Sequence, residues 1–148
     1  MKKTLILLAL LPSMCLAQWE TRRVDNGLDD PYKIAFNENL SGNLLKLERV
    51  DADICFYLTS SYFCEDISYT EMAFKINGEW KKFVVKSYKS KDNTTLFLNW
   101  SLGSDEEMLS AFKSATALRI RTNDGVCGSD IYDFSMSNST TAYNFMLK

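Results

Sequence analysis

Few residues of this sequence have the types and spacing that enzyme chemistry needs. The chain contains no histidine, which excludes Cys-His and Ser-His-Asp nucleophile systems and removes the commonest metal ligand. None of its six glycines falls in a GxGxxG or GxxxxGK phosphate-binding pattern. Paired carboxylates are the one catalytic arrangement that remains, because two acids suffice for glycoside hydrolysis. We therefore predict a protein that is not an enzyme and has no cofactor and no metal site. The alternative is a small carboxylate-dependent hydrolase of the cell envelope.

Residues 1–17, MKKTLILLALLPSMCLA, have the three parts of a secretory signal peptide. A basic head of two lysines precedes an apolar run of seven residues at 5–11, and the tripeptide CLA offers small residues before a cut. The run is far shorter than the roughly 20 apolar residues of a membrane-spanning helix, so we predict no membrane span. The large Met14 directly before Cys15 argues against lipoprotein processing. We predict cleavage after Ala17 and a periplasmic or secreted bacterial protein whose single domain occupies 18–148.

The mature chain keeps an odd number of cysteines, Cys55, Cys64 and Cys127, in an oxidising compartment. No two of them have the C-x-x-C spacing of a thioredoxin-like redox motif. Cys64 and Cys127 both lie near the ends of expected elements, where a disulfide bond would join two loops. Cys55 and Cys64 would instead face each other across a hairpin formed by CFYLTSSYFC. We predict the Cys64–Cys127 bond, with Cys55–Cys64 as the alternative.

One basic segment stands out from a chain whose formal net charge is −2. That overall charge argues against a nucleic-acid binder, which is usually basic. Residues 75–91 contain six lysines and a single acid, Glu79. Alternation around Asn77-Gly78 predicts one outward face that carries Lys75, Trp80, Lys82 and Lys86, with Tyr88 at its far end. Such a stripe suits a protein partner or an acidic envelope component. Alternatively, the lysines only keep an exposed sheet from pairing with other molecules.

Most of the chain alternates between apolar and polar residues with the period of a β-strand. Asn77-Gly78 between two such runs predicts a hairpin with a type I′ turn. That turn pairs Met72 with Phe83, so these two side chains share the inward face with Phe74 and Val85. The other expected strands are 32–37, 44–50, 54–63, 94–100, 117–122 and 131–136.

The segment GSDEEMLSAFKSAT breaks this alternation and predicts a helix at about 105–114. Ser104 and Glu107 have the spacing of a capping box, and apolar residues recur at helical spacing from Met108 to Ala115. The closing segment NSTTAYNFMLK predicts one further helical turn. Together the elements predict a mostly β fold. We expect a two-layer antiparallel β-sandwich of about 7–8 short strands, with one α-helix packed at an end or edge.

The segments DDPYKIAF, FKINGEWKKF and ALRIRTN and the closing YDFSMSNSTTAYNFMLK carry a pattern-level resemblance. In these segments the chain resembles small secreted bacterial β-sandwich accessory proteins found near type VI secretion and prophage loci. It is more faintly similar to invasion-associated periplasmic β-sandwich proteins. Asn138 stands where the pattern has Gly. The resemblance implies a non-enzymatic accessory or binding module that recognises a protein or an envelope component, and it brings no catalytic residues.

Overall fold

The computed structural model describes residues 18–25, 27, 30–50, 53–64, 67–101, 105–122 and 128–148. The predicted signal peptide at 1–17 lies outside these residues. Within them, no helix is long and apolar enough to cross a membrane.

The described residues form nine strands and two helices, which confirms the prediction of a mostly β fold. All neighbouring strands pair antiparallel in one sheet, whose order is β1-β2-β3-β4-β7-β6-β5-β8-β9. The strand count exceeds the expected seven or eight. The strands are β1 (Glu20–Val24), β2 (Tyr32–Glu38), β3 (Leu44–Val50), β4 (Asp53–Thr59), β5 (Tyr69–Ile76), β6 (Glu79–Lys89), β7 (Thr95–Ser101), β8 (Ala117–Thr122) and β9 (Ile131–Ser135).

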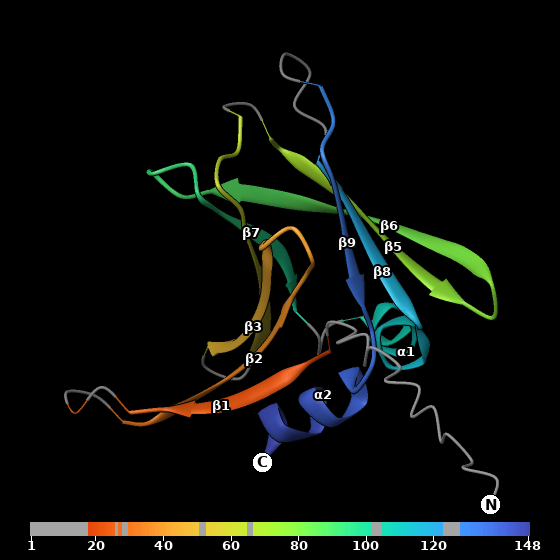
Figure 1. The fold of residues 1–148 in the computed structure, drawn as a ribbon. Coiled ribbons are helices and arrows are strands. Elements are labelled where there is room, and N and C mark those ends of the chain that lie inside the picture. The colour runs from red at the N-terminus through yellow and green to blue at the C-terminus, as the bar shows by residue number, and fades with distance from the viewer. Residues whose placement is uncertain are drawn as a thin grey trace, which may run out of the picture.

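The two expected layers are the two halves of this single sheet, which curls so that β2 approaches β9 (Figure 1). A long twisted sheet can curl in this way because successive strands rotate relative to one another. Asn37 Nδ2 of β2 donates a hydrogen bond of 2.6 Å to the carbonyl oxygen of Ser135 in β9. The Trp19 amide donates to the carbonyl oxygen of Ser137 at 3.1 Å. The apolar core fills the space between the two halves, where Phe56 contacts Trp100 and Phe112.

The β5–β6 hairpin has the register that its sequence predicts. Met72 lies opposite Phe83, and Ile76 lies opposite Glu79 across the turn. Asn77 and Gly78 both have positive φ, 50° and 89°, as a type I′ turn requires. On the inward face, Met72, Phe74 and Val85 are buried and Phe83 is partly buried against the core.

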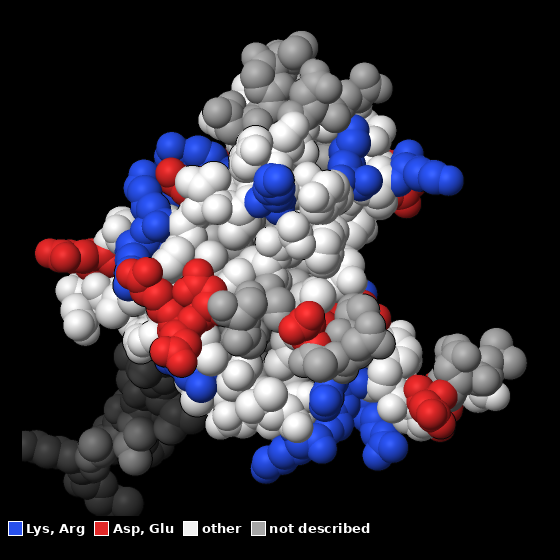
Figure 2. Space-filling model, turned by 180° about the vertical axis from the view of Figure 1, so that it is seen from behind, with Lys and Arg blue, Asp and Glu red and all other residues white. Residues whose placement is uncertain are grey.

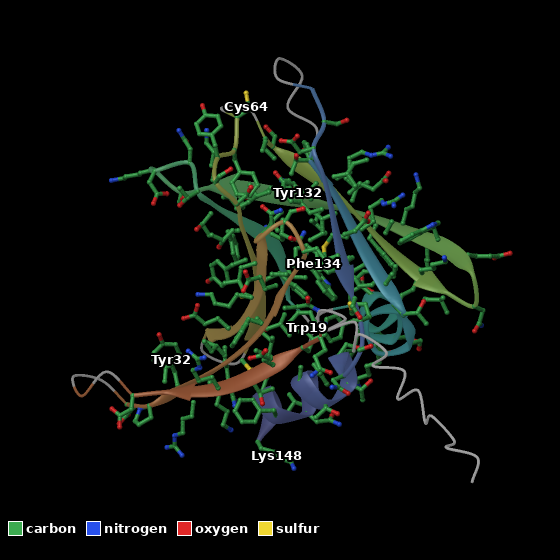
Figure 3. The ribbon with its side chains drawn as sticks, in the orientation of Figure 1. Trp19, Tyr32, Cys64, Tyr132, Phe134 and Lys148 are labelled. Atoms are coloured by element: carbon green, nitrogen blue, oxygen red, sulfur yellow. The ribbon has the colours of Figure 1, made fainter. Side chains whose placement is uncertain are left out.

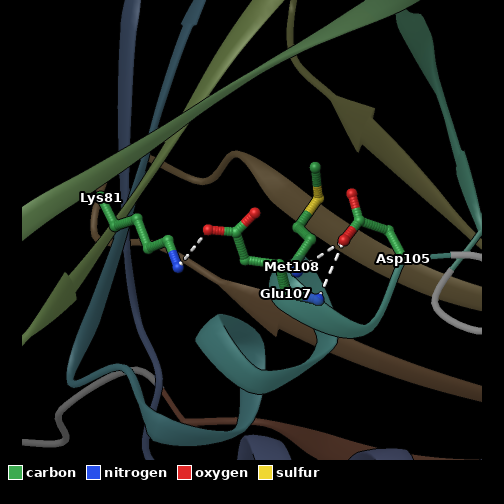
Figure 4. A network of polar contacts seen from close by, with 4 residues as sticks. All are labelled: Lys81, Asp105, Glu107 and Met108. Carbon is green, nitrogen blue, oxygen red and sulfur yellow. Dashed lines mark hydrogen bonds and ion pairs between the residues drawn. The ribbon is translucent and has the colours of Figure 1, made fainter.

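Helix α1 (Glu106–Ser114) starts within one residue of the predicted position, but the predicted capping box is wrong. Asp105 is the N-cap, and its Oδ1 accepts hydrogen bonds from the amides of Glu107 and Met108, both at 3.0 Å (Figure 4). Glu107 pairs instead with Lys81 of β6, with 2.7 Å between Oε1 and Nζ. The aspartate is the better cap here because its charge also interacts favourably with the helix dipole.

The second helix, α2 (Ser139–Leu147), is longer than the single turn expected from the sequence. It packs against β1, β2 and α1 at the end of the curled sheet (Figure 1). Ser139 Oγ and Thr140 Oγ1 donate hydrogen bonds of 3.1 Å to the carbonyl oxygens of Phe112 and Lys113 in α1. Asn138, the N-cap, has a φ of 66°. Asparagine tolerates this left-handed conformation better than most residues.

Candidate functional site

The five residues predicted to form a binding stripe project from the outer side of the sheet. The register aligns Lys75 with Trp80, Ala73 with Lys82 and Tyr69 with Lys86, all on the side away from buried Val85 and Ser87. Tyr88 follows on the same face, opposite Phe97 of β7. Trp80 is 37% exposed and Tyr88 is 55% exposed. The structure therefore brings Lys75, Trp80, Lys82, Lys86 and Tyr88 to one face, and their role in binding stays a prediction.

Two further cations, Arg119 and Arg121 of β8, extend this surface. Strand β8 pairs with β5, which places Arg119 opposite Ala73 and Arg121 opposite Glu71. Because Leu118 and Ile120 are fully buried, the two arginines point outward. We name the resulting surface the basic face. It consists of Lys75, Trp80, Lys82, Lys86, Arg119 and Arg121.

Trp80 lies at the hairpin-tip end of the basic face, and two cations hold its ring in place. Arg119 Cζ lies 5.0 Å and Lys75 Nζ lies 5.9 Å from the centre of its ring, so both cations interact with its π electrons. Arg119 is in turn fixed by Asp133 of β9, whose two carboxylate oxygens accept hydrogen bonds of 2.8 and 3.1 Å. These hydrogen bonds, together with the negative charge of Asp133, raise the pKa of the Arg119 guanidinium. The ring and its flanking cations are thus held in position before any partner arrives.

Sequence reasoning missed Arg119 and Arg121, although the alternation in ALRIRT assigns them to one face. The place of Arg119 beside Trp80, and that of Arg121 opposite Glu71, depend on the β5–β8 pairing, which no local sequence pattern predicts. Across β5, β6, β8 and β9 the outward positions carry five cations and two acids, Glu71 and Asp133. Lys82 Nζ pairs with Glu71 at 3.3 Å. Figure 2, which shows the back of the molecule, has Lys and Arg side chains in several groups, with uncharged surface and groups of Asp and Glu side chains between them.

An open depression of about 540 Å³ lies between the hairpin tip and α1. Its lining consists of Ile76, Asn77, Glu79, Trp80, Lys81, Ser110, Ala111 and Ser114. Glu79 is the single carboxylate in that lining, so this depression lacks the pair that a carboxylate-dependent hydrolase needs. Among the described residues, no cluster of three or more His, Cys, Asp or Glu side chains could hold a metal ion.

The cysteines do not follow the alternative pairing. Cys55 is a free, half-buried thiol on β4, whereas Cys64 is bonded in a disulfide. The Cys55–Cys64 alternative is therefore wrong, because β4 ends at Thr59 and pairs with β3 and β7 rather than folding back as a hairpin. Figure 3 shows Cys64 at the opposite end of the molecule from Lys148. Cys127 lies outside the described residues, so its bond to Cys64 stays a prediction.

The free thiol of Cys55 lies in a region that disfavours its ionisation. Burial raises the pKa of Cys55 above its usual 9.0, and the negative charges of Asp53 and Glu48 raise it further. Burial likewise raises the pKa of the neighbouring Tyr57, again with a contribution from Glu48. A thiol with a raised pKa is a weak nucleophile, since the thiolate is the reactive form. Cys55 is therefore poorly suited to nucleophilic catalysis.

Comparison with known proteins supports the fold but assigns neither a family nor a function. No family model matches the chain, and no curated protein matches it. Among solved structures, the crystal structure of invasion associated protein B from Bartonella henselae is similar, with a TM-score of 0.60 and 8% sequence identity. The match covers 89% of this chain and 93% of that one. At this identity, the likeness shows a shared fold alone.

Proposed function

We propose that the chain is a non-enzymatic binding or accessory module that works in the periplasm or outside a bacterial cell, like the small secreted proteins it resembles. It recognises a protein partner or another acidic component of the envelope through the basic face. The observation that carries the proposal is Trp80, an accessible ring held beside Lys75 and Arg119 on an outer sheet face. Tryptophan and arginine are the residues that most often dominate binding energies at interfaces.

The charges of the basic face support an acidic partner. Five cations against two acids leave this face positive on a chain that is negative overall. A local positive field speeds encounter with a negatively charged partner and disfavours positively charged ones. Asp133 already orders Arg119, so little side-chain entropy is lost when a partner binds there.

The competing explanation, that the lysines only prevent unwanted pairing of the sheet, does not account for Trp80. Keeping a sheet face soluble requires charge, whereas a large ring at the same place adds apolar surface. The ring does pack against its own neighbours, so its removal must also be checked for an effect on folding. Binding and stability therefore have to be measured on the same variants.

The proposal includes export and one disulfide bond. Cleavage after Ala17 is supported by the composition of the leader, and a Cys64–Cys127 bond by the bonded state of Cys64 and the free thiol of Cys55. The intact mass of the exported protein tests the cleavage site. A mass that includes a diacylglyceryl group on Cys15 would contradict it.

The decisive experiment identifies the partner and then removes the proposed contacts. Mature protein is used to capture partners from the periplasm of the producing cell, and the kinetics with the captured partner are measured by surface plasmon resonance. Trp80→Ala should weaken binding by about 2 kcal/mol or more, mainly through faster dissociation. The double variant Lys82→Glu/Lys86→Glu should slow association and reduce its dependence on salt.

Lys148→Glu, a change of the same kind at the C-terminal end of α2, serves as the matched control and should bind like the parent. Thermal unfolding of every variant establishes that the domain is folded. If Trp80→Ala and the double lysine variant are folded and bind with parental kinetics, the basic face is a solvated surface and the proposal fails.

A further inference from the structure

The outer side of the sheet also carries a straight row of side chains across five neighbouring strands, which adjoins the basic face on β6. The pairing registers place Phe36 of β2 opposite Lys46 of β3, Lys46 opposite Tyr57 of β4, Tyr57 opposite Phe97 of β7, and Phe97 opposite Tyr88 of β6. We name these five residues the aromatic row. Since neighbouring strands lie about 4.8 Å apart, the row is about 19 Å long.

The aromatic row faces away from the core. Its neighbours along the chain, such as Ala35, Leu45, Phe56 and Leu96, are fully buried, so the alternating positions point outward. Within the described part of the chain, α2 meets β2 on the inward side, where Lys33 Nζ lies 5.6 Å from the ring centre of Phe145. The other helix, α1, contacts β5 and α2. Neither helix therefore covers the row.

Neighbouring groups hold the rings of the row in place. The ring centres of Tyr57 and Phe97 are 5.4 Å apart, and those of Phe97 and Tyr88 are 6.2 Å apart with 24° between the ring planes. Lys46 Nζ lies 4.7 Å from the ring centre of Tyr57, and Arg22 Cζ lies 5.4 Å from that of Phe36. Three neighbouring rings, Tyr57, Phe97 and Tyr88, form an uninterrupted aromatic strip beside Lys46. Accessible apolar strips of this kind are a feature of binding sites. Because the rings are already ordered, a ligand would bind with a small entropic cost.

Polar side chains border the aromatic row on both sides. The outward positions next to the row on one side include the polar residues Glu48, Asn99 and Lys86, together with Ile34 and Cys55. On the other side they include Glu38, Thr59 and Thr95, together with Leu44. A pyranose sugar has C–H bonds on its flat face and hydroxyl groups around its rim. The C–H bonds pack against aromatic rings, and the hydroxyl groups bond to carboxylate, amide and hydroxyl side chains. The row and its borders offer both kinds of contact to a chain of several sugars.

The charges of this surface argue against a polyanionic ligand. Lys46 is paired with Glu48, and Glu20 continues the row opposite Phe36 on β1. With Glu38 also present, these three acids balance the three cations of the surface, Arg22, Lys46 and Lys86, and leave no excess of positive charge. A stacking surface for single-stranded nucleic acid would need such an excess along its length. We propose that the aromatic row binds an extended, uncharged glycan chain, with sugar rings packed on Tyr57, Phe97 and Tyr88.

The mature protein is titrated by isothermal calorimetry with three soluble hexasaccharides of different geometry. These are the β-1,4-linked oligomers of N-acetylglucosamine and of glucose, and the α-1,4-linked oligomer of glucose. At least one hexasaccharide should bind saturably, with one molecule bound per protein chain. Poly-glutamate should not compete with it for the site. Tyr57→Leu and Tyr88→Leu should each weaken that binding by about tenfold or more, since each removes a ring from the contact surface. Tyr57→Phe, which keeps the ring, should retain most of it.

The matched control is Tyr62→Leu. Tyr62 is 56% exposed, close to the 55% of Tyr88, but it lies in the loop after β4 and should leave glycan binding unchanged. The proposal is overturned if none of the three hexasaccharides binds, or if folded Tyr57→Leu and Tyr88→Leu bind like the parent. It is also overturned if the row proves to be a contact between two copies of the chain, seen as a dimer in sedimentation that Tyr88→Leu dissociates. Trp80→Ala, at the opposite end of β6 from Tyr88, should leave glycan binding intact, so failures of the two proposals are distinguishable.

Discussion

Replacing Asn37 by aspartate tests the contact that joins the two ends of the curled sheet. Asn37 is fully buried on β2, and its Nδ2 donates to the carbonyl oxygen of Ser135 on β9 at 2.6 Å. Its Oδ1 has no hydrogen-bond partner among the described residues. The substitution Asn37→Asp keeps the shape of the side chain but turns the donor into a second acceptor. Two oxygens would then face each other across the junction.

The expected cost follows from these contacts. Losing the hydrogen bond costs about 1 kcal/mol, and a buried carboxylate without a partner adds several more. We expect the free energy of unfolding at pH 7 to fall by about 3–5 kcal/mol, a large part of the 5–15 kcal/mol typical of a domain. Burial should raise the folded-state pKa of the introduced carboxyl above its unfolded value of about 3.9. The loss in the free energy of unfolding should therefore be greatest above the folded-state pKa. It should become smaller as the pH falls through that pKa, because the neutral carboxyl can donate a hydrogen bond to the carbonyl oxygen of Ser135.

Urea unfolding of the parent and of Asn37→Asp at about pH 7 and about pH 4.5 measures both effects, with stability compared at each pH. Asn99→Asp, the same change at an exposed position on β7, controls for the added charge. A loss below about 1 kcal/mol at pH 7, no larger than one hydrogen bond, would refute the reasoning. So would a deficit that does not shrink on acidification. In either case the Asn37–Ser135 contact would not hold β2 against β9.

Three further predictions concern the helix cap and the cysteines. Asp105→Ala should lower the free energy of unfolding by about 1 kcal/mol, and Asp105→Ser should restore most of it, as read from urea midpoints at an unchanged m-value. Burial and nearby carboxylates raise the pKa of Cys55, so the rate of its alkylation should reach half of its maximum above pH 9.0. Glu48→Gln should lower the pH of that midpoint. A midpoint that does not move would exclude Glu48 as a cause of the raised pKa. Peptide mapping without reduction should yield a peptide cross-linked between Cys64 and Cys127. That bond would close a loop of roughly sixty residues and add about 4 kcal/mol to the free energy of unfolding. A cross-linked peptide that contains Cys55 would contradict the pairing.

Two elements were predictable because their signals lie within one short stretch. The β5–β6 hairpin needs an Asn-Gly turn and alternation on both sides of it, and together these fix which residues pair. The position of α1 follows from apolar residues at helical spacing. Its cap was mispredicted by one residue because Ser104 and Asp105 are both good N-caps and only the start of the helix decides between them.

Strand β1 shows why other elements escaped prediction. Its sequence ETRRV has four exposed residues and no alternating apolar positions. The segment is extended because β2 supplies its hydrogen-bond partners. The predicted strand at 54–63 was too long for a related reason. Apolar residues recur as far as Phe63, which is buried, but the chain leaves the sheet after Thr59 and reaches the core from a loop.

The sequence by itself determined which side chains of a strand share a face, because that alternation is a local property of extended backbone. It therefore placed Trp80 with Lys75 and Lys82 before any neighbour was known. Only the tertiary structure decided which strands lie side by side. Backbone hydrogen bonds are alike for every sequence, so the β5–β8 and β4–β7 pairings are selected by the burial of whole faces across the curled sheet. The β5–β8 pairing brings Arg119 to Trp80, and the β4–β7 pairing together with the β6–β7 pairing places Phe97 between Tyr57 and Tyr88.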